Sequence, residues 1–101
     1  MPIFVAVHTW KKEDFIAVGK KVIEALGNLP DGISLCSSYI HETGGWCVYT
    51  SESSEAGKKI EDFLTKNVPN MKSEVTPVLQ FFPPSQDLYA VLYKIIESTT
   101  K

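Results

Sequence analysis

The sequence predicts an α+β fold in which strands and helices follow one another as βαββαβ, with one further helix at the C-terminus. Four runs with alternating apolar residues predict the strands, and two amphipathic segments predict the helices between them. The chain has 101 residues, 44% of them hydrophobic, and contains neither a tandem repeat nor a low-complexity linker. We therefore expect one domain over residues 1–101, with a core over 1–82 and a helix over 85–98.

The first expected strand, residues 3–10, is apolar on both of its faces. Ile3, Val5 and Val7 form one face, and the other face carries His8 among apolar residues. A strand of this kind is typical of a sheet that is covered on both sides.

The first expected helix covers residues 13–28, because apolar residues recur there at helical spacing. Acidic residues occupy its first turn, and Gly27 suits its end. The segment 30–32 has the Pro-Asp-Gly chemistry of a turn and leads into a second strand over 33–42.

A hairpin is expected next, in which residues 43–45 supply positive φ angles and residues 46–51 return as the third strand. A three-residue loop would pair His41 with Cys47. A two-residue loop would shift every pairing and change the face that each side chain occupies. The sequence leaves both registers open.

A second helix is expected up to residue 67, followed by a fourth strand over 71–82. Pro77 lies inside this strand, and proline cannot donate to a strand ladder, so the strand belongs at a sheet edge. The ferredoxin-like strand order 4-1-3-2 places the fourth strand at an edge, in agreement with this argument. Ser85 then begins the C-terminal helix, which has its own apolar stripe.

Two crossover helices can shield only one face of a four-stranded sheet, whereas the first strand is apolar on both faces. A second layer must therefore cover the other face. Either a second subunit or the C-terminal helix of the same chain can supply that layer. We expect the second subunit, and hence a homodimer.

Four stretches of the chain resemble small domains of the dimeric α/β-barrel superfamily, including relatives of a nickel-binding-protein-like group. This resemblance implies two βαββαβ sheets that face each other across a shared barrel. The superfamily includes monooxygenases, isomerase-like enzymes, stress-response proteins and binding proteins, so the fold does not select an activity. The stretches are Leu29-Pro30-Asp31-Gly32, Ser38-Tyr39, Gly44-Gly45-Trp46-Cys47-Val48-Tyr49 and Glu74-Val75-Thr76-Pro77-Val78.

The predicted topology gathers polar and aromatic residues at one end of the sheet. His8, Trp10 and Glu74 are expected to share the face away from the helices. His8 has the chemistry of a general base, although a histidine held by structural hydrogen bonds fits the same pattern. Glu74 would orient His8 or accept a proton, which makes these two the candidate catalytic residues.

Three functions follow from this arrangement. The first is a homodimer that binds a small apolar or aromatic ligand. The second is a cofactor-free monooxygenase or isomerase-like enzyme with His8 as its base. The third is a nickel- or zinc-binding protein that uses His8, His41 and either Cys47 or Glu74, although no dense ligand spacing supports a metal site. The expected ligand-binding residues are Phe4, His8, Trp10, Tyr39, Trp46, Tyr49 and Glu74.

Charge and composition argue against several other classes of function. The formal net charge is −2, arginine is absent and no basic run exceeds two residues, so neither a nucleic-acid partner nor a phosphorylated substrate is expected. The N-terminal stretch lacks a basic region before its apolar residues, which predicts no signal peptide, no membrane association and a cytoplasmic location. The sequence indicates no particular cofactor.

Overall fold

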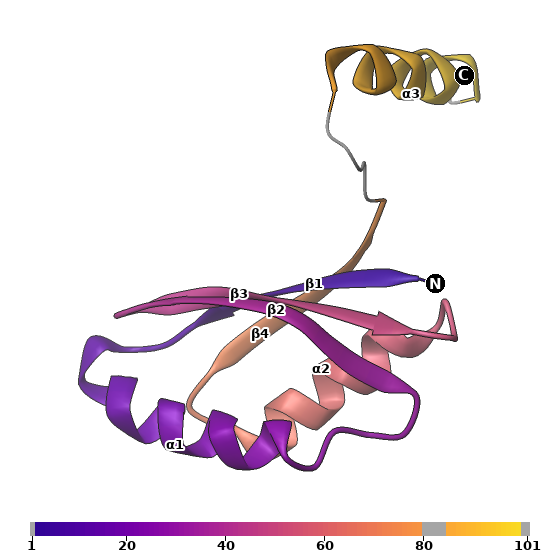
Figure 1. Ribbon diagram of the computed structural model, residues 1–101. Coiled ribbons are helices and arrows are strands. Elements are labelled where there is room, and N and C mark those ends of the chain that lie inside the picture. The colour runs from indigo at the N-terminus through magenta and orange to yellow at the C-terminus, as the bar shows by residue number, and fades with distance from the viewer. Residues whose placement is uncertain (1, 80–84, 100–101) are drawn as a thin grey trace.

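Four antiparallel strands form one sheet with two helices packed on one of its faces (Figure 1). The computed structural model describes residues 2–79 and 85–99. The strand order β2-β3-β1-β4 confirms the predicted ferredoxin-like α+β arrangement. The elements are β1 (Ile3–Thr9), η1 (Lys12–Asp14), α1 (Phe15–Leu26), β2 (Ile33–His41), β3 (Gly44–Ser51), α2 (Ala56–Asn67), β4 (Lys72–Val78) and α3 (Gln86–Thr99).

Strand β4 lies at the sheet edge, as Pro77 predicts, and pairs only with β1 among the described strands. Proline is tolerated there because its missing N–H is not needed by a neighbour on the outer side. The predicted continuation of this strand to residue 82 lies partly outside the described residues.

The hydrophobic core lies between the sheet and the helices α1 and α2. It forms because alternate residues of each strand project toward the helices, which turn their apolar stripes to meet them. The largest fully buried side chains are Tyr49, Phe4, Ile60, Val18 and Val68.

The prediction that Ile3, Val5 and Val7 face the helices is wrong. Phe4 and His8 are buried on the helix side, and Val7 is 41% exposed on the opposite side, called here the open face. Alternation separates the two faces of a strand but does not say which face is covered when both are apolar. The face that the helices cover is the one that carries the phenyl ring of Phe4.

Gly57 of α2 explains how that ring is accommodated. A Cβ atom at this position would lie 3.3 Å from Cε1 of Phe4, which is tight for a carbon–carbon contact. The glycine therefore lets the helix approach the sheet closely over the phenyl ring.

The β2–β3 hairpin has a two-residue turn at Glu42 and Thr43, so His41 pairs with Gly44 and the three-residue loop is excluded. The prediction that residues 43–45 supply positive φ angles is also wrong, because among the described residues only Gly32 has one, at 82°.

Close backbone approach explains Gly44 and Gly45 instead. A Cβ on Gly44 would collide with the carbonyl oxygen of His8, and one on Gly45 would collide with that of Tyr39. The glycines therefore permit the tight contact of the hairpin with its neighbouring strand segments.

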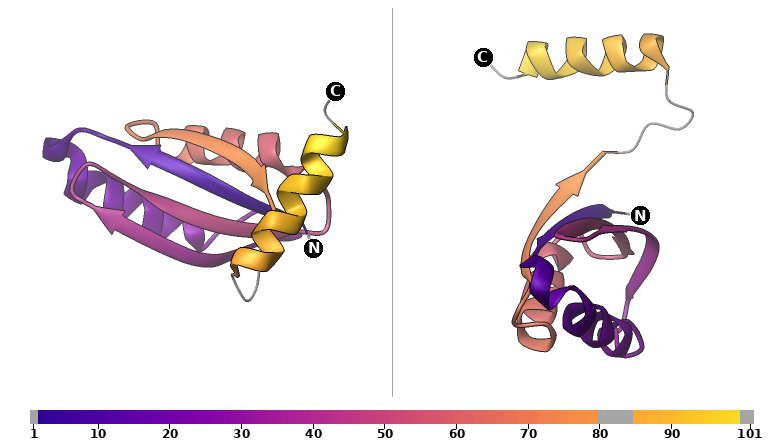
Figure 2. Two further views of the ribbon diagram at one scale, coloured as in Figure 1. Left: turned by 90° about the horizontal axis from the view of Figure 1, so that it is seen from above. Right: turned by 90° about the vertical axis from the view of Figure 1, so that its left-hand side faces the viewer.

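Helix α3 stands clear of the rest of the chain, on the side of the sheet opposite α1 and α2 (Figures 1 and 2). None of its residues is buried. None of the helices described here combines the length and the apolar composition that crossing a bilayer requires.

Candidate functional site

The structure divides the predicted site residues between the two faces of the sheet. The β1–β4 register pairs His8 with Ser73 and Val7 with Glu74. Directly paired residues project to the same side, so His8 and Glu74 lie on opposite faces. The expected cluster of His8, Trp10 and Glu74 is therefore not formed.

On the helix side, His8 is 4% exposed, and its Nδ1 lies 2.8 Å from Oγ of Ser73. Cys47 is nearby on the same face, with Sγ 3.4 Å from Oγ of Ser38. These contacts correspond to a histidine held inside the core by a structural hydrogen bond.

A narrow cavity of about 30 Å³ lies beside His8 and is also lined by Trp10, Cys47 and Tyr49. This volume is about that of one water molecule, so it does not admit an aromatic ligand. Phe4 and Tyr49 are each only 1% exposed and belong to the core. His8 and Tyr49 of the predicted ligand set thus have no space for a ligand beside them on the helix side.

Burial on the helix side shifts the pKa values of His8 and Tyr49. Loss of solvation lowers the pKa of His8 from its ordinary 6.5 to about 4, so the imidazole is neutral at pH 7. Burial raises the pKa of the Tyr49 hydroxyl, and neighbouring Cys47 raises it further. Neither group changes its charge near neutral pH in the folded protein.

We expect the free energy of unfolding to fall as the solution is acidified below pH 6.5. The unfolded chain protonates His8 near 6.5 and the folded chain only near 4, so the unfolded state binds more protons between these values. The loss between pH 7 and pH 5 should be about 2 kcal/mol. Urea unfolding of the wild type and of His8→Gln measures it.

His8→Gln should flatten this pH dependence, whereas the control Thr65→Gln, on the exposed surface of α2, should leave it unchanged. If the wild type and His8→Gln lost equal stability between the two pH values, the buried neutral state of His8 would be refuted.

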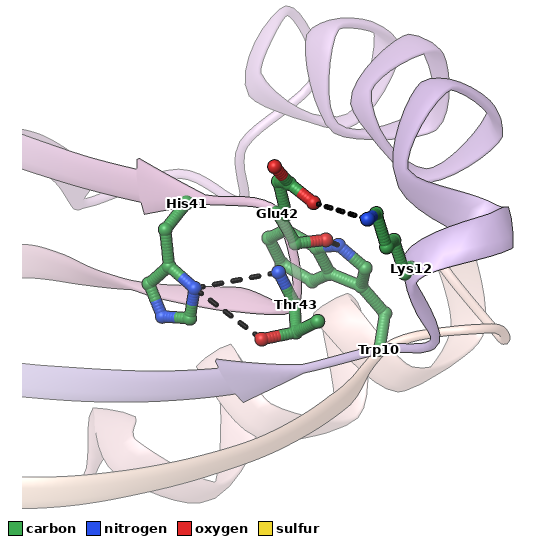
Figure 3. A network of polar contacts seen from close by, with 5 residues as sticks. All are labelled: Trp10, Lys12, His41, Glu42 and Thr43. Atoms are coloured by element: carbon green, nitrogen blue, oxygen red, sulfur yellow. Dashed lines mark hydrogen bonds and ion pairs between the residues drawn. The ribbon is translucent and has the colours of Figure 1, made fainter.

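The hairpin turn is tied to the end of β1 by a polar network (Figure 3). The indole Nε1 of Trp10 donates to the carbonyl oxygen of Glu42 at 2.7 Å, and Nζ of Lys12 lies 3.2 Å from Oε2 of Glu42. The backbone N–H of Thr43 donates to Nδ1 of His41 at 3.3 Å. Trp10 and His41 thus hold the turn in place.

The residues proposed as metal ligands do not come together. His41 is on the open face, with its ring 5.6 Å from that of Trp46, whereas His8 and Cys47 face the helices. Within residues 2–79 and 85–99, no group of three or more His, Cys, Asp or Glu side chains is placed to hold a metal ion.

A hollow of about 670 Å³ lies between the end of β1 and the loop before β4. It is broad and open, and mostly polar residues line it. Of the predicted site residues it includes only Trp10, whose indole N–H is already bonded to Glu42. We therefore do not assign the site to this hollow.

The open face presents a continuous row of side chains across all four strands. Tyr39 of β2 pairs with Trp46 of β3, Trp46 pairs with Val7 of β1, and Val7 pairs with Glu74 of β4. Tyr39 is 59% exposed and Trp46 46% exposed. Neighbouring strands are about 4.8 Å apart, so β4, which carries Glu74, lies about 10 Å from β3, which carries Trp46.

A second apolar row lies beside the first, because Val5 pairs with Val48 in the register of β1 and β3. Sequence reasoning did not assign Val5 and Val7 to the site, although the two-sided apolar character of the first strand was the signal for it. Together the two rows form a flat apolar platform with an acidic edge, which we call the aromatic platform. It is defined by Tyr39, Trp46, Val5, Val7, Val48 and Glu74.

Comparisons with protein-family models, with curated proteins and with solved structures give no match to this chain. The strand order alone gives the fold, an α+β sheet consistent with the ferredoxin-like arrangement, and the aromatic platform is interpreted from its own chemistry.

Proposed function

We propose that the chain is a homodimeric protein that binds a small apolar or aromatic molecule on the aromatic platform. The observation that supports this proposal is the exposed row of Tyr39, Trp46, Val7 and Glu74 on a face that no other described element covers. A contiguous apolar patch of this kind is typical of a partner or ligand surface. A second subunit over this face would give the two-layered assembly of a dimeric α/β barrel.

The chemistry of the platform favours a flat ligand with one polar group. Indole and phenol rings offer stacking surfaces, and Val7 extends the apolar surface toward β4. Glu74 can accept a hydrogen bond from the ligand or attract a cation at the far end of the row. The ligand class that fits is an aromatic molecule with a hydroxyl or amino group.

Two probes test this proposal. The first is 1-naphthalenemethanol, which is neutral, and the second is 1-naphthylmethylamine, which is a cation at neutral pH. Calorimetric titration should show binding of both, with the amine bound more tightly because Glu74 attracts its ammonium group. Trp46→Ala should weaken both about tenfold, since the stacking surface is lost.

Glu74→Gln should remove only the preference for the amine. Phe63→Ala is the control, since it removes an aromatic ring from α2 on the helix side, and it should leave both dissociation constants unchanged. Absence of binding, or binding that is indifferent to Trp46→Ala, would refute the ligand site.

No comparable observation supports the enzymatic alternative with His8 as a base. His8 is hydrogen-bonded to Ser73, and the space beside it is about 30 Å³. A substrate would need room within hydrogen-bonding reach of the imidazole.

A further inference from the structure

Helix α3 has one apolar side and one polar side. Leu88, Val91 and Ile95 recur at spacings of three and four residues, which places them on one stripe of the helix, and each is about half exposed. By the same spacing Ala90 and Glu97 lie on the opposite side. The apolar stripe has no partner layer within the described part of the chain.

A helix of this length needs such a partner. It has 14 residues, and isolated helices shorter than about 15 residues are marginal in water. Most of the stability of a short amphipathic helix comes from packing its apolar face. A stable α3 therefore requires a surface that receives the stripe.

The open face of the sheet is a surface of matching character. It is uncovered and carries the apolar side chains of the aromatic platform, and α3 stands on that side of the sheet but does not pack on it (Figure 2). One chain thus carries both an unpaired helix stripe and an unpaired sheet face. In a two-fold dimer the stripe of each α3 can pack on the open face of the other chain, which buries both apolar surfaces.

The exposed area agrees with an assembly of this size. The chain exposes 7342 Å², against about 5,700 Å² for a compact monomer of the same mass. The excess is about 1,600 Å² per chain, or about 3,200 Å² for two chains, which lies in the range of about 2,000–5,000 Å² buried in obligate homodimers. Packing of α3 on its own sheet would remove a similar area, and the cross-linking experiment below distinguishes the two arrangements.

We infer that α3 of each protomer packs its apolar stripe on the open sheet face of a second copy, where it covers the aromatic platform. The partner's α3 then supplies the outer wall of the ligand site, and Trp46 and Val7 supply the inner wall. This inference rests on the proposed homodimer and specifies which segment of the partner completes the site.

Substitutions in α3 test the contact in the full-length protein. Ile95→Glu places a carboxylate in the stripe and should weaken dimerisation about 100-fold in sedimentation experiments. Ala90→Glu adds the same charge to the opposite side and should leave the dimer constant unchanged. Ile95 is already 56% exposed, so the fold of each protomer should survive, as circular dichroism would show.

Cross-linking tests the exchange between chains. In a Cys36→Ser background, one chain carries Val7→Cys with a mass tag and the other carries Ile95→Cys without a tag. After mixing and incubation with a short bismaleimide, a tagged–untagged conjugate should form. Cys47 is buried and should not react.

The other outcomes separate this inference from the proposed function. The first is a dimer that is insensitive to Ile95→Glu and gives conjugates only between two Val7→Cys chains. That result would mean that the two sheets pack directly on each other, which refutes the helix exchange and keeps the homodimer. A conjugate formed only within a chain that carries both cysteines would show α3 on its own sheet and would overturn the exchange. A wild-type monomer would overturn both proposals.

Discussion

Replacing Val5 by lysine is expected to separate the dimer into folded monomers. Val5 lies at the centre of the open face, where Val48 and Thr76 are its cross-strand neighbours and no carboxylate lies directly opposite. In the monomer the ammonium group reaches water. In the dimer it would be buried without a partner, on both protomers, at a cost of several kcal/mol.

We expect the dissociation constant to rise at least about 1,000-fold, measured by sedimentation equilibrium over a range of concentrations. The matched control is Thr65→Lys, which adds the same charge to the exposed surface of α2. It should leave the dimer intact. Equal behaviour of the two variants would show that the open face is not the interface.

Replacing Phe4 by alanine is expected to cause the largest loss of stability among the substitutions considered. Its ring is 1% exposed and packs against α2 at Gly57. Removing a buried phenyl ring costs about 3–5 kcal/mol, because the transfer free energy is lost and a cavity remains. This is a large share of the total stability of a small domain, about 5–15 kcal/mol.

Urea unfolding measures this loss. Phe15→Ala is the control, since Phe15 is only partly buried and stacks on Trp10 with ring centroids 6.3 Å apart. It should cost clearly less than Phe4→Ala. A Phe4→Ala variant that lost under about 1 kcal/mol would contradict the position assigned to this ring in the core.

The strand order could be predicted from the sequence because local signals determined it. Pro77 excluded a central position for the last strand, and Pro30-Asp31-Gly32 marked the turn in which Gly32 has a φ of 82°. Each of these signals depends on the backbone of one or two residues, and such preferences act before any tertiary contact forms.

The face assignment could not be predicted in the same way. The first strand is apolar on both sides, and the hairpin register depended on a loop length that differed by one residue between the alternatives. That difference decides whether Tyr39 pairs with Trp46 or with another residue. A slip of this size moves each side chain of the hairpin to the other face. His8 and Glu74 were expected together for the other reason: the helix-facing side of the first strand was assigned wrongly, and the register of β1 with β4 places the two residues on opposite faces.

The glycines of the hairpin show a further limit of sequence reasoning. Gly44 and Gly45 were interpreted through their φ angles, whereas the structure requires them for close approach to the carbonyl groups of His8 and Tyr39. A glycine needed for space and one needed for conformation are identical in sequence, and only the neighbouring strands distinguish them.

The two apolar faces of the first strand are the sequence feature that leads to the proposed site. Two-sided apolar character in the first strand called for a second layer, and the structure leaves the face of Val5 and Val7 without one among the described elements. The aromatic platform and the stripe of α3 are the two surfaces that such a layer would join.

Sedimentation equilibrium of the unmodified 101-residue chain at micromolar concentration decides whether it forms the homodimer on which both proposals depend. The account predicts a particle of twice the chain mass of 11.3 kDa. A particle of 11.3 kDa that persists as the concentration is raised would contradict it.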